Sequence, residues 1–140
     1  MASIMVDSCV FVAALNSKDK NHNEGKTIME KILKKQTTYK FVINDYILDE
    51  VVTYLRKKVG YDISIKVLNL LLNQNYFTLL KVTEENLKAA YFFFKRYDGL
   101  SFTDACILST MISNNIKKII SFDSNFDIIK NIERINSLSS

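Results

Sequence analysis

The chain has 140 residues, the length of one ordinary domain, and can bury about two thirds of its unfolded surface without disulfide or metal staples. With 48% apolar and 24% charged residues, three glycines and no proline, its composition excludes a low-complexity or linker-rich protein. The formal net charge of +4 favours polyanionic partners.

Several chemistries are excluded by residue types that are scarce here. Cys9 and Cys106 lack the spacing of a zinc or redox motif and are predicted to be buried free thiols. His22, the only histidine, is predicted to be solvated in a loop, which leaves no histidine triad or histidine metal site. The isolated glycines form no phosphate-binding loop, and no apolar run is long enough to span a membrane, so a cytoplasmic protein is expected.

Short β-rich runs alternate with helical spacings along the chain. The predicted strands lie at residues 4–6, 39–43, 76–82 and 118–121. The predicted helices begin at Ser8 and cover residues 21–36, 44–59, 62–73, 83–96 and 104–113, with a helical turn, a possible strand and a frayed tail over 124–140. Side chains that can accept from the free amides of a first turn are expected at the helix starts: Ser8, Asn44 or Asp45, Thr83 and Thr103. This alternation predicts one α/β domain over residues 1–140, with a mainly parallel sheet covered by helices on both faces.

Two acidic residues follow predicted strands directly. Asp7 comes after the first strand and Asp123 after the last apolar strand. Because ligands of open parallel sheets bind outside the carboxyl ends of the strands, both should face one crevice, and Asp104 can join them from a helix start. Carboxylates that share a pocket repel one another unless a cation neutralises them, and hard oxygen ligands suit Mg²⁺ or Mn²⁺. Such a site predicts hydrolysis of phosphodiesters.

Each acid also has a purely structural interpretation. These interpretations are a helix N-cap for Asp7, a solvated helix charge for Glu50, a first-turn acid for Asp104 and a turn former for Asp123. Glu50 lies on the flank of the apolar stripe of its helix, and Asp45 and Asp49, four residues apart on one face, compete with it.

Four motifs, taken together, resemble the PIN-domain ribonucleases over nearly the whole chain, and most closely the single-domain toxins of the VapC type. They are Val6-Asp7-Ser8, Asp49-Glu50-Val51, Ser101-Phe102-Thr103-Asp104-Ala105 and Ser121-Phe122-Asp123-Ser124-Asn125-Phe126. The resemblance implies a three-layer α/β/α sandwich and a cytoplasmic endoribonuclease that depends on Mg²⁺ or Mn²⁺. It also implies an RNA substrate, an antitoxin partner and a homodimer.

The resemblance further implies the residues of the site. Its metal ligands would be Asp7, Glu50, Asp104 and Asp123, and the choice of Glu50 over Asp49 rests on the resemblance only. Thr103 or Ser121 would orient an acid or a water molecule. The alternative function is a PIN-like RNA-binding or scaffolding module without catalysis.

Two further features bear on the surface of the protein. Asp127 lies four residues beyond Asp123 and is predicted to be a surface acid outside the site. The aromatic run Tyr91-Phe92-Phe93-Phe94 is predicted to lie partly in the core, through alternate members, and partly at an interface such as a dimer contact.

Overall fold

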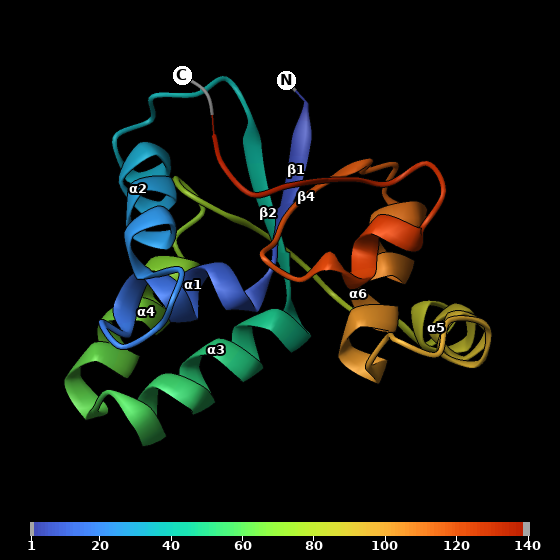
Figure 1. Ribbon diagram of the computed structural model, residues 1–140, viewed down its shortest axis with the longest axis horizontal. Coiled ribbons are helices and arrows are strands. Elements are labelled where there is room, and N and C mark those ends of the chain that lie inside the picture. The colour runs from blue at the N-terminus through green and yellow to red at the C-terminus, as the bar shows by residue number, and fades with distance from the viewer. Residues whose placement is uncertain (1, 139–140) are drawn as a thin grey trace.

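A five-stranded sheet forms the centre of the protein in the computed structural model, which describes residues 2–138 (Figure 1). Its strands are β1 (Ser3–Val6), β2 (Lys40–Asn44), β3 (Thr78–Leu80), β4 (Lys118–Ile120) and β5 (Glu133–Ile135). The spatial order is β3-β2-β1-β4-β5, and all four neighbouring pairs are parallel. The predicted parallel sheet is therefore confirmed.

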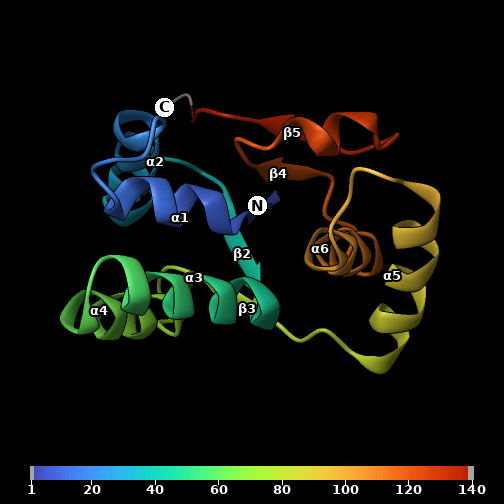
Figure 2. The same cartoon turned by 60° about the horizontal axis from the view of Figure 1, so that its bottom comes forward.

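Helices cover both sides of this sheet. They are α1 (Ser8–Leu15), α2 (His22–Leu33), α3 (Asp45–Lys58), α4 (Tyr61–Leu71), α5 (Glu84–Arg96) and α6 (Phe102–Ser113), with a 3₁₀ helix, η1, at Ser124–Ile128. Figures 1 and 2 both show α1 to α4 on one side of the strands and α5 and α6 on the other. The predicted three-layer α/β/α arrangement is confirmed. Among residues 2–138, no helix is long and apolar enough to cross a bilayer.

The helix starts follow capping chemistry, with two changes from the prediction. Asn44 caps α3 and Thr83 caps α5, as expected. The cap of α1 is Asp7 rather than Ser8, because the Asp7 carboxylate accepts from the Ser8 N–H. The cap of α6 is Ser101 rather than Thr103, because Ser101 and Asp104 form a reciprocal capping box that starts the helix two residues earlier.

The core is formed by the apolar strands and the inner faces of α1 to α4 and α6. Ile4, Met5 and Val6 of β1 are fully buried, which explains why this strand is a continuous apolar run. Gly25 lets α2 approach α1 closely, since a Cβ at this position would lie 2.8 Å from the Ala14 nitrogen. Gly60, at the end of α3, has a φ of 146°, a conformation that favours glycine.

Two expectations about individual segments are wrong, and the expectation for the aromatic run is met in part, since Phe93 packs against the core. The strand predicted over residues 76–82 shortens to Thr78–Leu80, an edge strand that pairs with β2 alone. His22 is half-buried, with its Nδ1 2.8 Å from the Ala13 carbonyl oxygen, so it packs on the end of α1. In the aromatic run, Tyr91, Phe92 and Phe94 are 54%, 64% and 48% exposed, because α5 packs mainly on α6 and leaves its other faces open. The frayed tail predicted at the C-terminus includes residues 139–140, which lie outside the described residues.

Candidate acidic site

Asp7 is held rigidly at the carboxyl end of β1. Its backbone N–H donates to the Ile120 carbonyl of β4 at 3.0 Å, which fixes the residue at the sheet end. Its side chain is 4% exposed. One carboxylate oxygen accepts from the Ser8 N–H at 2.8 Å, and the other accepts from the Ser121 hydroxyl at 2.7 Å. The N-cap interpretation of Asp7 is thus correct, and it leaves the carboxylate beside the neighbouring strand end.

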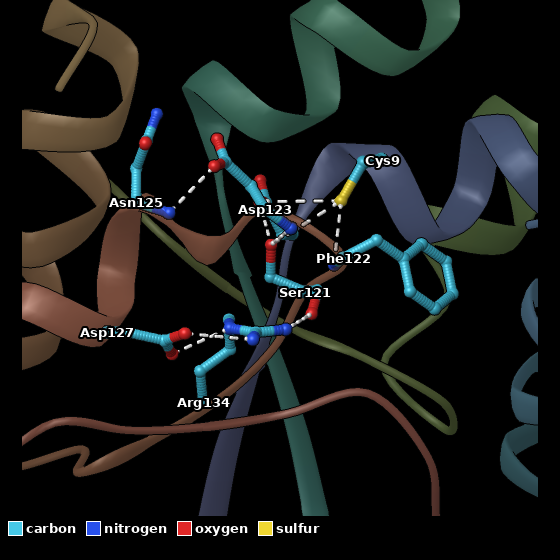
Figure 3. A network of polar contacts seen from close by, with 8 residues as sticks. Cys9, Ser121, Phe122, Asp123, Asn125, Asp127 and Arg134 are labelled. Atoms are coloured by element: carbon cyan, nitrogen blue, oxygen red, sulfur yellow. Dashed lines mark hydrogen bonds and ion pairs between the residues drawn. The ribbon is translucent and has the colours of Figure 1, made fainter. Parts of the chain in front are cut away.

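The segment after β4 places Asp123 next to Asp7. The Ser121 hydroxyl, which donates to Asp7, accepts from the Asp123 N–H at 2.9 Å. The Asp123 carboxylate then caps η1 by accepting from the Asn125 N–H at 2.9 Å (Figure 3). Ser121 is fully buried and connects the two acids through one hydroxyl group. The turn-former interpretation of Asp123 therefore also describes its local structure.

The acids on α3 turn in different directions. Glu50 accepts a hydrogen bond from the Ser8 hydroxyl at the start of α1. Asp49 instead accepts from Thr53, one turn along its own helix, at 3.4 Å. Asp45 accepts from the Val82 N–H at 2.9 Å, which ties the start of α3 to the chain after β3. Of the three acids, Glu50 is the one bonded to the residue that follows Asp7.

Asp104 enters the site from the first turn of α6. Its N–H donates to the Ser101 hydroxyl at 3.0 Å, and its carboxylate accepts from the Ser101 N–H at 3.3 Å. A buried hydrogen bond from the Asn44 side chain to the Thr110 hydroxyl, 3.2 Å long, links the start of α3 to the middle of α6. This contact fixes the helix that carries Glu50 relative to the helix that carries Asp104.

The electrostatics show that these carboxylates act on one another. Burial, together with the negative charge of Asp104, raises the pKa of Asp7 to about 6, against the lowering effect of the hydrogen bonds from Ser121, Ser8 and Cys9. Burial also raises the pKa of Asp104, with added contributions from the charges of Asp123 and Glu50. Among residues 2–138, the ion pairs join other side chains and none includes these four acids.

The four carboxylates have the chemistry of a metal site but not its geometry. Carboxylate oxygens that repel one another are the ligands that a hard divalent cation neutralises. As the side chains lie, however, no group of three or more His, Cys, Asp or Glu residues within the described part of the chain is arranged to hold a metal ion. The chemistry of the four acids fits Mg²⁺ or Mn²⁺, while the structure contains no preformed coordination shell.

Two other side chains stand at the edge of the acids. Thr103 lines a pocket together with Glu50 and makes no side-chain hydrogen bond to any of the four acids. Cys9 lies among the site residues, with its sulfur 3.5 Å from both Asp7 Oδ2 and the Ser121 hydroxyl, and burial raises the pKa of its thiol to about 12. Cys9 is therefore an uncharged neighbour of Asp7 and Ser121. Both cysteines are free, as predicted.

Arg134 is a residue of this region that sequence reasoning missed. Its guanidinium donates to the Ser121 carbonyl at 3.0 Å and forms a two-pronged pair with the Asp127 carboxylate at 2.8 and 2.9 Å. Figure 3 shows Ser121 between Arg134 on one side and Cys9 and Asp123 on the other. Asp127 thus lies outside the acidic cluster, as predicted, but it belongs to a clamp on the segment that carries Ser121. No sequence motif signals this clamp.

Comparison with known proteins identifies the class of protein. The family model described as the PIN domain matches residues 4–132. The chain therefore belongs to the PIN domain family. A search of curated proteins finds no match.

Solved structures of VapC toxins share the fold. VapC20 of Mycobacterium tuberculosis, described as a toxin that cleaves the sarcin–ricin loop, is 22% identical, with 89% of this chain and 92% of that chain covered and a TM-score of 0.75. VapBC2 of Rickettsia felis, bound to a DNA fragment of its promoter, is 16% identical over 95% and 97% of the two chains, with a TM-score of 0.67. DNA-bound VapBC of Salmonella typhimurium is 13% identical over 96% and 98%, with a TM-score of 0.68.

Proposed function

We propose that this protein is a metal-dependent endoribonuclease and the toxin of a toxin–antitoxin pair. The observation that carries the proposal is the gathering of Asp7, Glu50, Asp104 and Asp123 at the carboxyl end of a parallel sheet. The charge of Asp104 contributes to the raised pKa of Asp7, and the charges of Asp123 and Glu50 contribute to the raised pKa of Asp104. None of the four acids forms an ion pair within residues 2–138. A site built this way is unfavourable alone and favourable with a cation.

Asp7, Glu50, Asp104 and Asp123 are the residues that would hold Mg²⁺ or Mn²⁺. When bound, such an ion supplies an activated water molecule and neutralises charge on a phosphodiester. This donor set contains only oxygen ligands, which these ions prefer.

The protein's own hydroxyl groups position the acids. Ser121 donates to Asp7 and, by accepting the Asp123 N–H, sets the direction of the following turn. The Ser8 hydroxyl, at the start of α1, donates a hydrogen bond to the Glu50 carboxylate. Thr103 precedes Asp104 and lines a pocket beside Glu50, a place from which its hydroxyl can bind substrate or water. We assign Ser121 and Thr103 these orienting roles.

The nature of the substrate and partner is supported by the structural relatives. VapC20 is described as a toxin that cleaves the sarcin–ricin loop, and the Rickettsia felis and Salmonella typhimurium structures are VapBC complexes. For this chain we propose an RNA substrate in the cytoplasm and an antitoxin that covers the acidic site. A homodimer belongs to the same proposal, since the exposed aromatic side chains of α5 offer an apolar surface.

Cleavage of end-labelled structured RNAs, including tRNAs, tests the enzyme activity. Purified protein is incubated with Mn²⁺, with Mg²⁺ and with EDTA, beside Asp7→Asn and Asp104→Asn variants. Asp62→Asn is the matched control, because Asp62 is an exposed first-turn acid of α4 outside the site. We expect metal-dependent cutting that falls at least about 1,000-fold in both site variants and persists in the control.

Cutting that continues in EDTA, or equally in Asp104→Asn, would contradict the proposal. RNA binding of equal strength in wild type and Asp104→Asn, without any cutting, would instead identify a binding module. The toxin role is tested separately by expression without a partner, which should slow growth of the host in wild type and not in Asp7→Asn. Equal growth of both cultures would remove the toxin role and leave the nuclease in place.

A further inference from the structure

A pocket of about 390 Å³ lies beside the acidic cluster and shares Glu50 with it. It is formed by α3 and the first turn of α6, and its lining residues are Tyr46, Asp49, Glu50, Thr53, Tyr54 and Thr103. Its volume is within the range of small-molecule sites, about 300 to 1,000 Å³. Because Glu50 belongs to both the pocket and the acidic cluster, a group bound here would be adjacent to the proposed cleavage site.

Two aromatic side chains contribute to the pocket wall, and both are held in place by other contacts. Tyr54 accepts a hydrogen bond from the Asn16 side chain at 3.2 Å. Tyr46 packs against the buried cluster that includes Ala90 and Ala105. Flat rings that are fixed by the fold are the surfaces on which unstacked RNA bases are bound. The pocket therefore offers binding area for a planar heterocycle.

Asp49 gives this pocket a specific polarity. Its carboxylate accepts only the Thr53 hydroxyl, at 3.4 Å, and forms no ion pair among the described residues. An ionised carboxylate is an acceptor with several free lone pairs, so it selects partners that donate. A phosphate cannot donate and would be repelled, whereas the edge of a base carries N–H groups.

We propose that this pocket is a nucleobase subsite in which Asp49 reads the donor edge of guanine. Guanine presents two adjacent donors, the ring N1–H and the exocyclic amino group, and one carboxylate can accept both. Charge-assisted pairs of this kind are stronger than neutral hydrogen bonds. The proposal rests on the proposed ribonuclease function and adds a substrate preference to it. It also gives a role to Asp49, the acid of α3 that bonds to Thr53 on its own helix.

Mapping of cleavage sites tests the subsite during turnover. Wild type, Asp49→Asn and the control Asp62→Asn are incubated with Mn²⁺ and an RNA of randomised sequence, and the ends are sequenced. Wild type and the control should share an enrichment of guanine at one fixed distance from the cut, and Asp49→Asn should lose it. The same base profile in wild type and Asp49→Asn would overturn the proposal.

A binding measurement keeps the subsite testable without catalysis. The probe is a fluorescein-labelled single-stranded oligouridine that carries one guanosine, compared with the same oligomer carrying inosine, which lacks the amino group. Protein with Asp104→Asn should bind the guanosine oligomer about tenfold more tightly, and the additional change Asp49→Asn should remove this difference. Equal affinities for the two oligomers in the Asp104→Asn protein would refute the assignment. If wild type cuts no RNA, the proposed function fails, but this measurement still decides whether the pocket binds a base.

Discussion

The two ends of the central sheet differ in how their charged side chains are paired. At the amino ends of the strands, Lys118 lies 3.3 Å from the Tyr39 hydroxyl and 4.0 Å from Glu133, so opposite charges meet close to solvent. At the carboxyl ends, Asp7 is buried and feels the like charge of Asp104. The first arrangement is the ordinary chemistry of a surface, whereas the second is expected to lower the stability of the folded protein when no cation is bound.

Pocket size does not distinguish the two ends. A pocket of about 330 Å³ near the amino ends is lined by residues such as Lys35, Tyr39, Phe41 and Tyr76, and no carboxylate contributes to its wall. The pocket of about 390 Å³ beside Glu50 has two carboxylates. The two ends of the sheet therefore differ in their electrostatics rather than in the size of their pockets, and raised carboxylate pKa values are the property that marks the carboxyl end as the candidate site.

The largest effect on stability is expected from Asp7→Asn in the absence of divalent cations. Asparagine keeps the cap of α1 but carries no charge. Because the folded-state pKa of Asp7 is raised to about 6 from 3.8, wild type loses stability as pH rises through this interval. Above it, the variant should be more stable by up to about 3 kcal/mol, and near pH 4 the difference should vanish. Urea unfolding with EDTA at pH 4 and 7.5 measures both values.

Asp127→Asn gives the opposite sign and serves as the control. The pKa of Asp127 is lowered by its hydrogen bonds with Arg134, so its ionised form stabilises the folded protein. That variant should be less stable than wild type at pH 7.5, and the deficit should shrink toward pH 3. A destabilised Asp7→Asn at pH 7.5 would show that the acidic end is not under electrostatic strain.

Divalent cations should reverse the loss of stability that repulsion among the acids causes at the carboxyl ends of the strands. A ligand that binds only the folded state adds about 2.7 kcal/mol of stability at a hundred times its dissociation constant. Mg²⁺ or Mn²⁺ should therefore raise the melting temperature of wild type and have little effect on Asp7→Asn or Asp104→Asn. Thermal unfolding over a cation series, with Asp62→Asn as control, measures the effect. An equal rise in all four proteins would indicate cation binding elsewhere.

A smaller effect is expected from Arg134→Met, which removes the clamp behind Ser121. The Arg134 side chain is 17% exposed, and it donates to the Ser121 carbonyl at 3.0 Å. Losing this bond should cost about 1 kcal/mol and loosen the segment that carries Ser121 and Asp123. RNA cleavage should fall more than stability alone explains, with kcat reduced and KM nearly unchanged. Asp127→Asn, which leaves the bond to Ser121 in place, should retain most of the activity.

The sequence predicted the framework of the site because strand ends are local features. Apolar runs fix where β1 and β4 stop, and the acids Asp7 and Asp123 follow from that position. The parallel order of the sheet brings them to one edge, so their approach required no knowledge of individual contacts.

Contacts between residues far apart in the chain could not be predicted from the sequence. The contact that distinguishes Glu50 from Asp49 is the hydrogen bond from the Ser8 hydroxyl, 42 residues away, which periodicity alone does not predict. The start of α6 depended on two hydroxyl residues only two positions apart, Ser101 and Thr103, and the capping box decided it. Arg134 reaches Ser121 because β5 lies beside β4, which no short motif encodes.

The smallest effect is expected from Lys118→Met, at the amino end of β4. Lys118 contacts Glu133 at 4.0 Å near solvent, and exposed ion pairs of this kind contribute little because water and salt screen them. The Met side chain can keep the apolar contact with the Tyr39 ring, which lies 5.4 Å from the lysine nitrogen. We expect a melting temperature and a rate of RNA cleavage indistinguishable from wild type at 0.15 M salt. A loss of cleavage in Lys118→Met with unchanged stability would show that the amino end of the sheet also binds RNA, and the contrast between the two ends would then have to be abandoned.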